Sequence, residues 1–143
     1  MRKATIFIVV VAMFVAGLTT LATAQTKFGE LLWELEVSVK WSSQSSDWRG
    51  RRAAWREEVA SAANVAEMKV LLKEFERNIK WSAQYPSWKN KRSGWMGRVD
   101  AASTQGELAR TLIALEKSIK YEAQASNWRS KRPGWLARVR ELQ

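Results

Sequence analysis

The sequence predicts an all-α protein built from three tandem helical hairpins, and three observations lead to this fold class. One pattern returns at a spacing of 40 residues, over 36–59, 76–99 and 116–139. Apolar residues within each repeat recur every three or four positions, which is typical of an amphipathic helix. Turn-forming residues interrupt each repeat near its middle. A fixed period of this size indicates an array in which neighbouring units share a core.

Within the segments 36–59, 76–99 and 116–139, seven positions are identical in all three copies while their neighbours have diverged. The seven are Glu36/Glu76/Glu116, Lys40/Lys80/Lys120, Gln44/Gln84/Gln124, Trp48/Trp88/Trp128, Arg52/Arg92/Arg132, Trp55/Trp95/Trp135 and Val59/Val99/Val139. We expect a physical contact at each of these positions.

The first helix of each repeat is predicted from an apolar face and a start signal. In the second repeat, Met68, Leu71, Leu72 and Phe75 lie on one face of a helix. The patterns Asn64-x-x-Glu67 and Thr104-x-x-Glu107 are capping boxes, in which the side chains satisfy free amides of the opening turn. The predicted helices cover residues 27–44, 65–84 and 105–124.

A second, shorter helix follows each break in the apolar pattern. Pro86 disfavours a continuous helix, and the aligned residues Asp47, Ser87 and Asn127 are good N-caps. The next residues place Trp, Arg, Trp and Val on a narrow stripe, as at positions 48, 52, 55 and 59. Glycine and proline inside this helix, at Gly94 and Pro133-Gly134, are expected to kink it or to split off its first turn.

The array is expected to form one domain over residues 25–143, with repeats at 25–63, 64–103 and 104–143. Two arrangements fit three equal hairpins: an open superhelical stack, or a compact bundle that the third repeat closes. Equal repeats favour the open stack, because each then makes the same contact with its neighbour.

The segment 1–24 has the order of a secretory signal peptide. Arg2 and Lys3 precede an apolar run that ends in Ala22-Thr23-Ala24, so cleavage after Ala24 is expected. The alternative is an uncleaved membrane anchor, since the run is nearly long enough to span a bilayer at about 20 residues. Cleavage would remove two positive charges and lower the net charge from +10 to +8. The prediction is an exported protein, periplasmic or extracellular, without a transmembrane segment after cleavage.

The chain contains neither cysteine nor histidine. Disulfides, Cys/His zinc sites, thiol nucleophiles and His-based triads are therefore excluded. Each repeated acid occurs once per unit, whereas glycoside hydrolysis needs two unlike carboxylates in one cleft. We expect no enzyme activity, no cofactor and no metal.

A structural role is expected for the Trp stripe and its arginine. A charge among tryptophans needs a partner, and the antiparallel hairpin brings a glutamate of the first helix within reach, with Trp faces covering the guanidinium. The structural set is Glu36, Trp48, Arg52, Trp55, Glu76, Trp88, Arg92, Trp95, Glu116, Trp128, Arg132 and Trp135.

Ligand binding is the second expectation, for basic, aromatic and amide positions near each turn. The aromatic position at 41, 81 and 121 faces away from the apolar stripe, where either a neighbouring repeat covers it or it offers a platform for stacking. The repeated lysine can instead pair with the glutamate four residues earlier, and the glutamine can cap the first helix. The candidates are Lys40, Trp41, Gln44, Arg49, Arg51, Lys80, Trp81, Gln84, Lys89, Lys91, Lys120, Tyr121, Gln124, Arg129 and Lys131.

Two functions follow from these features. The first is a non-catalytic binding module for an anionic polymer or surface, such as an acidic glycan, the cell wall or nucleic acid, because a strongly basic exported protein meets such partners. The alternative is a scaffold that self-assembles or binds a partner protein. Membrane disruption ranks lower, because the regular periodicity favours a folded core.

Overall fold

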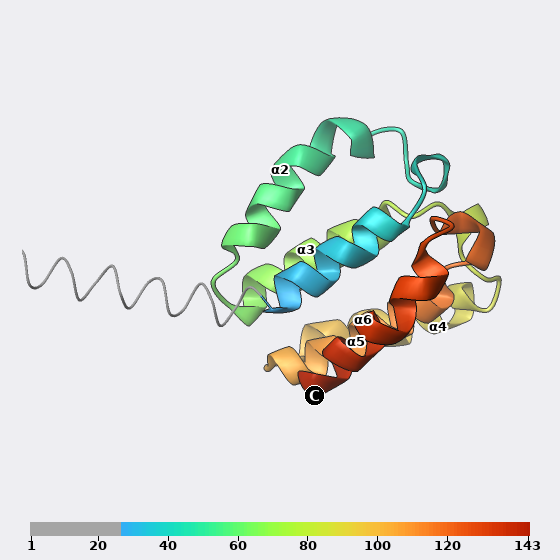
Figure 1. The fold of residues 1–143 in the computed structure, drawn as a ribbon. Coiled ribbons are helices and arrows are strands. Elements are labelled where there is room, and N and C mark those ends of the chain that lie inside the picture. The colour runs from blue at the N-terminus through green and yellow to red at the C-terminus, as the bar shows by residue number, and fades with distance from the viewer. Residues whose placement is uncertain (1–26) are drawn as a thin grey trace, which may run out of the picture.

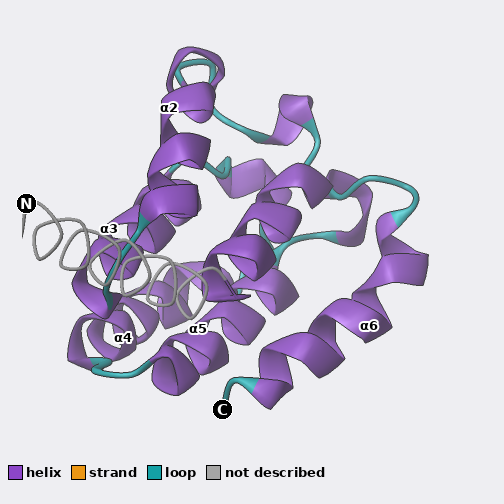
Figure 2. Ribbon diagram, turned by 60° about the vertical axis from the view of Figure 1, so that its left-hand side comes forward, coloured by secondary structure: helices purple, strands orange, loops and turns teal. Residues whose placement is uncertain are grey.

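The computed structural model describes residues 27–143, and the predicted signal segment 1–24 lies outside them. These residues form an all-helical fold with isolated bridges as the only β-type pairing (Figure 2). A helix over 27–38 is followed by η1 (Trp41–Ser43), α2 (Trp48–Ser61), α3 (Val65–Arg77), η2 (Trp81–Ala83), α4 (Trp88–Ala101), α5 (Gln105–Ser118), η3 (Tyr121–Ala123) and α6 (Trp128–Glu141). Each repeat is thus a long helix, a 3-10 turn and a second helix.

The first helix of each repeat is shorter than predicted. It ends at residues 38, 77 and 118, and the next residues are extended, with φ −63° and ψ 147° at Lys40. The reason is a bond to the neighbouring repeat: the Lys80 amide donates to the Ser43 carbonyl at 2.9 Å instead of continuing the helix. Such a bond is invisible to the periodicity of one repeat.

The second helices begin where predicted, but their N-cap residues act differently. Asp47, Ser87 and Asn127 have helical backbone angles and make no side-chain cap bond. The tight turn satisfies the first amide instead, as in the Trp48 amide bond to the Ser45 carbonyl at 3.1 Å. Neither glycine nor proline splits these helices, for α4 and α6 each run for 14 residues.

The two capping boxes are confirmed. The Asn64 side chain accepts a bond from the Glu67 amide at 2.9 Å, and Thr104 accepts one from the Glu107 amide at 3.1 Å. The glutamate reaches back one residue further than the usual box, since Glu67 accepts from the Ala63 amide at 2.9 Å.

The three repeats close into a ring, and the expectation of an open stack is wrong. The same antiparallel bridge joins Gln44 to Ile79 and Gln84 to Ile119, and its third copy joins Gln124 back to Val39. All three turn segments consequently meet at one end of the molecule, the right-hand side of Figure 1. We call this the turn end. Closure is favoured because an open array would leave two apolar repeat faces in water, whereas the ring packs these two faces against each other.

The core of the ring consists of the apolar faces of the long helices and the Trp stripe of the short ones. The six repeated tryptophans of α2, α4 and α6 are at most 5% exposed, which confirms their predicted packing. The two tryptophans of each stripe meet edge to face, with ring centroids 5.3 Å apart for Trp48 and Trp55. This rigid interior positions the side chains at the turn end.

Candidate functional site

A buried glutamate anchors each hairpin, and the predicted pairing with arginine is confirmed in all three repeats. The N–O distances are 2.7 Å for Arg52–Glu36 and 2.9 Å for both Arg92–Glu76 and Arg132–Glu116. Each carboxylate is at most 2% exposed, so the pair holds a charge that water does not solvate.

The tryptophans support this pair differently from the prediction. Instead of covering the guanidinium, the first Trp of each stripe donates its indole N–H to the carboxylate, at 3.2 Å for Trp48 and 3.1 Å for Trp88 and Trp128. The repeated Trp48, Trp88 and Trp128 therefore hold the anion, and the guanidinium lies at its outer side.

In the second and third repeats the guanidinium and carboxylate match one to one. Arg92 donates from Nε and Nη2 to Glu76, and Arg132 donates from the same two atoms to Glu116. These hydrogen bonds raise the pKa of Arg92 and of Arg132 above the ordinary arginine value. A raised pKa stabilises the fold below the ordinary value, and this contribution is lost only when the pH rises through the higher one.

The first repeat departs from this pattern because Arg56 joins the cluster. Arg56 donates to Glu36 Oε1 from Nε at 3.2 Å and from Nη2 at 3.0 Å. Arg52 keeps a single bond, from Nε to Oε2 at 2.7 Å. Two cations therefore share one carboxylate here.

The aromatic residues at the start of each 3-10 turn are exposed, which decides between the two predicted alternatives. Trp41, Trp81 and Tyr121 are 47%, 54% and 50% exposed. A cation from the next helix lies near each ring: Arg49 at 5.2 Å from the Trp41 centroid, Lys89 at 5.3 Å from Trp81 and Arg129 at 4.0 Å from Tyr121. We call these three pairs the cation–aromatic surface.

The cations of this surface make no ion pair within residues 27–143. This holds for Arg49, Lys89 and Arg129, and also for the repeated Lys40, Lys80 and Lys120, which precede the aromatic residues in sequence. The predicted pairing of Lys40 with Glu36 is wrong, because the helix ends before Lys40 while the Glu36 side chain points into the buried cluster.

The other candidates do not belong to these cation–aromatic pairs, although each repeated glutamine lines a hollow together with the nearby aromatic residue. The amides of Gln44, Gln84 and Gln124 are buried, and two of them donate to the repeated glutamate, at 3.0 Å from Gln44 and 3.4 Å from Gln124. Arg51 is held by Glu58 and Glu74. The aligned Lys91 and Lys131 stay exposed, and each lines a groove between two repeats.

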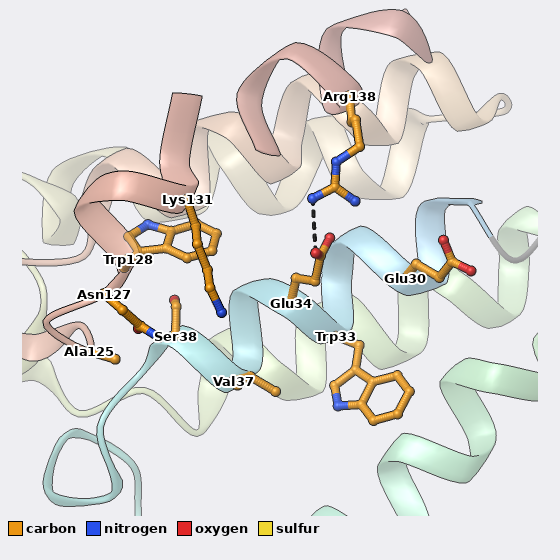
Figure 3. A pocket seen from close by; sticks show the side chains of 10 residues that line it. All are labelled: Glu30, Trp33, Glu34, Val37, Ser38, Ala125, Asn127, Trp128, Lys131 and Arg138. Atoms are coloured by element: carbon orange, nitrogen blue, oxygen red, sulfur yellow. Dashed lines mark hydrogen bonds and ion pairs between the residues drawn. The ribbon is translucent and has the colours of Figure 1, made fainter. Parts of the chain in front are cut away.

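The groove between the third and first repeats is the more apolar of these two. It encloses about 430 Å³ between α6 and the helix over 27–38 (Figure 3). Trp33 and Val37 contribute exposed apolar surface, at 41% and 51%. Glu34 binds Arg138 at 2.9 Å through one oxygen, while its other oxygen is buried without a hydrogen bond. The equivalent groove between the second and third repeats is lined by Lys91, Arg98 and Lys117.

Sequence comparison of the repeats missed two residues, Arg56 and Trp33. Arg56 lies with its guanidinium carbon 5.4 Å from the Trp33 ring centroid. Both positions differ between repeats, with Met96 and Lys73 as the equivalents in the second. The signal in the sequence was the presence of an arginine and a tryptophan in the first repeat only, and comparing the repeats for identical positions does not detect such differences.

Comparisons with known proteins give one family match. The family described as "Domain of unknown function (DUF8799)" matches residues 62–129, which extend from the end of the first repeat into the start of α6. No curated protein and no solved structure matches the chain.

Two further findings concern residues 27–143 only. No helix among them is both long and apolar enough to cross a bilayer. Nor do they contain a cluster of three or more acidic side chains suited to a metal ion.

Proposed function

We propose that the protein is an exported, non-catalytic binding module that engages an anionic polymer or surface through the cation–aromatic surface. One observation carries the proposal. Three exposed aromatic side chains lie at the turn end of the molecule, and each has beside it a cation without an acidic partner in residues 27–143. Unpaired cations beside aromatic faces suit a ligand that is both anionic and able to stack.

The closed ring strengthens this proposal because it gathers the three pairs at the turn end. In an open array the equivalent positions would follow one another along an edge. The bridges between neighbouring turns instead hold them around one pseudo-threefold axis. A polymer that contacts two or three pairs at once gains avidity beyond that of a single pair.

The test measures the salt dependence of binding to anionic polymers. Duplex DNA and an acidic polysaccharide serve as probes, with binding measured from low to high salt. The variant combines Arg49→Ala, Lys89→Ala and Arg129→Ala. Each cation that neutralises a phosphate of duplex DNA contributes about 0.9 to the slope of log K against log salt, so this variant should have a slope shallower by about 3.

A matched control removes the same charge from the opposite end. Arg98, Arg110 and Arg140 are exposed cations away from the turns. Their triple alanine variant should retain a slope close to that of the native protein. If both triple variants weaken binding equally, the effect arises from net charge and not from the cation–aromatic surface. Binding that does not depend on salt would contradict the proposal.

The alternative is a protein-interaction scaffold, and the groove of Figure 3 is the observation that favours it. Trp33 and Val37 expose apolar surface there, and the buried oxygen of Glu34 lacks a donor that a partner can supply. Sedimentation of the native protein and of Trp33→Ala tests this scaffold in its self-assembling form. A strict monomer at high concentration contradicts that form of the scaffold.

A further inference from the structure

We infer that the first repeat contains an oxyanion site for a phosphate or sulfate group, formed by Arg49 and Arg52 beside Trp41. The inference deepens the proposed function, on which it rests for the idea that such a group belongs to a polymer. It begins from the surplus positive charge in the first repeat's buried cluster.

Arg56 creates that surplus by displacing Arg52 from part of the carboxylate. Where methionine or leucine occupies the equivalent position, at Met96 and Leu136, the guanidinium binds the glutamate through two nitrogens. In the first repeat Arg56 occupies Glu36 Oε1, so the Nη atoms of Arg52 have no acceptor within residues 27–143. Arg52 is 21% exposed and its Nη atoms are not among the buried unpaired atoms, so these N–H groups reach solvent and are free to bind an added anion.

A second guanidinium contacts the same indole ring. Arg49 and Arg52 have their guanidinium carbons 5.2 and 4.9 Å from the centroid of the same Trp41 ring. Two like charges at one indole repel each other, and an anion that contacts both would offset this repulsion. Arginine donates two parallel hydrogen bonds to phosphate and similar groups, and a tetrahedral anion offers enough oxygens for two guanidinium ions.

The surroundings of Arg49 are also suited to an anion. A hollow of about 480 Å³ is lined by Trp41, Arg49, Lys80 and by the serines Ser42 and Ser46. Lys80 comes from the second repeat, and the bridge between Gln44 and Ile79 brings it to the site. The aligned positions are less suitable elsewhere: Pro86 replaces Ser46 in the second repeat, and the acidic Glu122 replaces Ser42 in the third.

The test follows the arginine side-chain N–H signals of the full chain by NMR during titration with inorganic phosphate and sulfate. Saturable shifts are expected for Arg49 and Arg52, while Arg92 and Arg132 act as internal controls. Arg56→Met copies the second repeat and lets Arg52 bind both oxygens of Glu36. It should weaken the Arg52 response at least tenfold.

A gain-of-function variant tests whether the loss of response in Arg56→Met has a cause other than the proposed site, such as misfolding. Met96→Arg combined with Lys89→Arg gives the second repeat the same two guanidinium groups, and Arg92 should then respond to phosphate. The inference is overturned if Arg52 does not respond in the native protein, if Arg92 responds equally there, or if Arg56→Met leaves the response unchanged.

Polymer probes identify the source of the group and separate the two proposals. An oligonucleotide and a sulfated oligosaccharide carry the same kind of anion, and the one that shifts Arg52 at the lower concentration is its source. If phosphate shifts Arg52 but neither polymer binds, the site stands and the proposed function fails. If polymers bind equally to native protein and Arg56→Met, the proposed function stands and this inference fails.

Discussion

The indole N–H of Trp135 donates a hydrogen bond to the carbonyl oxygen of Leu31 at 2.9 Å, across 104 positions of sequence. Trp55 and Trp95 make the same bond to Leu71 and Thr111 in the following repeat. Trp135 of the third repeat thus bonds to the first repeat in the same way as the other two tryptophans bond to the next repeat, and this contact closes the ring.

We expect Trp135→Phe to destabilise the fold as much as Trp55→Phe and Trp95→Phe do. Each change removes one hydrogen bond to a helix carbonyl oxygen, which contributes about 0.5–1.5 kcal/mol, and adds a packing defect. Urea unfolding of the three variants measures the effect. In an open array Trp135 would have no repeat to bond, so a near-neutral Trp135→Phe beside two costly equivalents contradicts the ring.

Glu76→Gln should destabilise the protein by about 3 kcal/mol, because breaking a buried pair leaves one partner uncompensated. Arg92 loses its charged acceptor while the Trp88 N–H keeps only a neutral one. The double variant Glu76→Gln with Arg92→Met should recover part of the loss. A double-mutant cycle gives the coupling energy, and strictly additive single effects would show that the two residues do not interact.

Glu58→Gln should lower stability slightly near neutral pH and have no effect in strong acid. A hydrogen bond from Arg51 lowers the pKa of Glu58, so its stabilising contribution is present above the unfolded-state pKa and disappears as the pH falls through the folded value. Denaturant midpoints between pH 2 and pH 7 measure the difference. Glu57→Gln is the control, since Glu57 makes no ion pair in the described part of the chain, and an equal pH trend there would contradict the assignment.

Trp81→Leu should leave stability within about 0.5 kcal/mol of the native value, because the ring is half exposed. Stacking on an aromatic side chain contributes about 1–3 kcal/mol per base, so binding to single-stranded DNA should weaken at least fivefold if this ring contacts the ligand. Fluorescence titration at fixed salt measures the affinity. Unchanged affinity would remove Trp81 from the binding surface.

Much of the candidate site was predictable because it repeats. The pairing of Glu36 with Arg52 follows from hairpin geometry and the cost of a buried charge, and three identical copies strengthen the argument. The role of Arg56 was not predictable in this way, since one unrepeated arginine on a helix resembles an ordinary surface cation until its carboxylate partner is located.

The sequence by itself determined the all-helical hairpins, their turns and the composition of the core, because apolar periodicity and capping residues act over a few residues of chain. Only the tertiary structure decided that the three hairpins close into a ring, that the long helices stop at 38, 77 and 118, and that the rings of Trp41, Trp81 and Tyr121 stay exposed. These features depend on backbone bonds between repeats, such as that of Lys40 to Ala123. Every repeat offers the same backbone donors and acceptors. The local sequence pattern therefore does not reveal whether the third repeat faces solvent or packs against the first repeat.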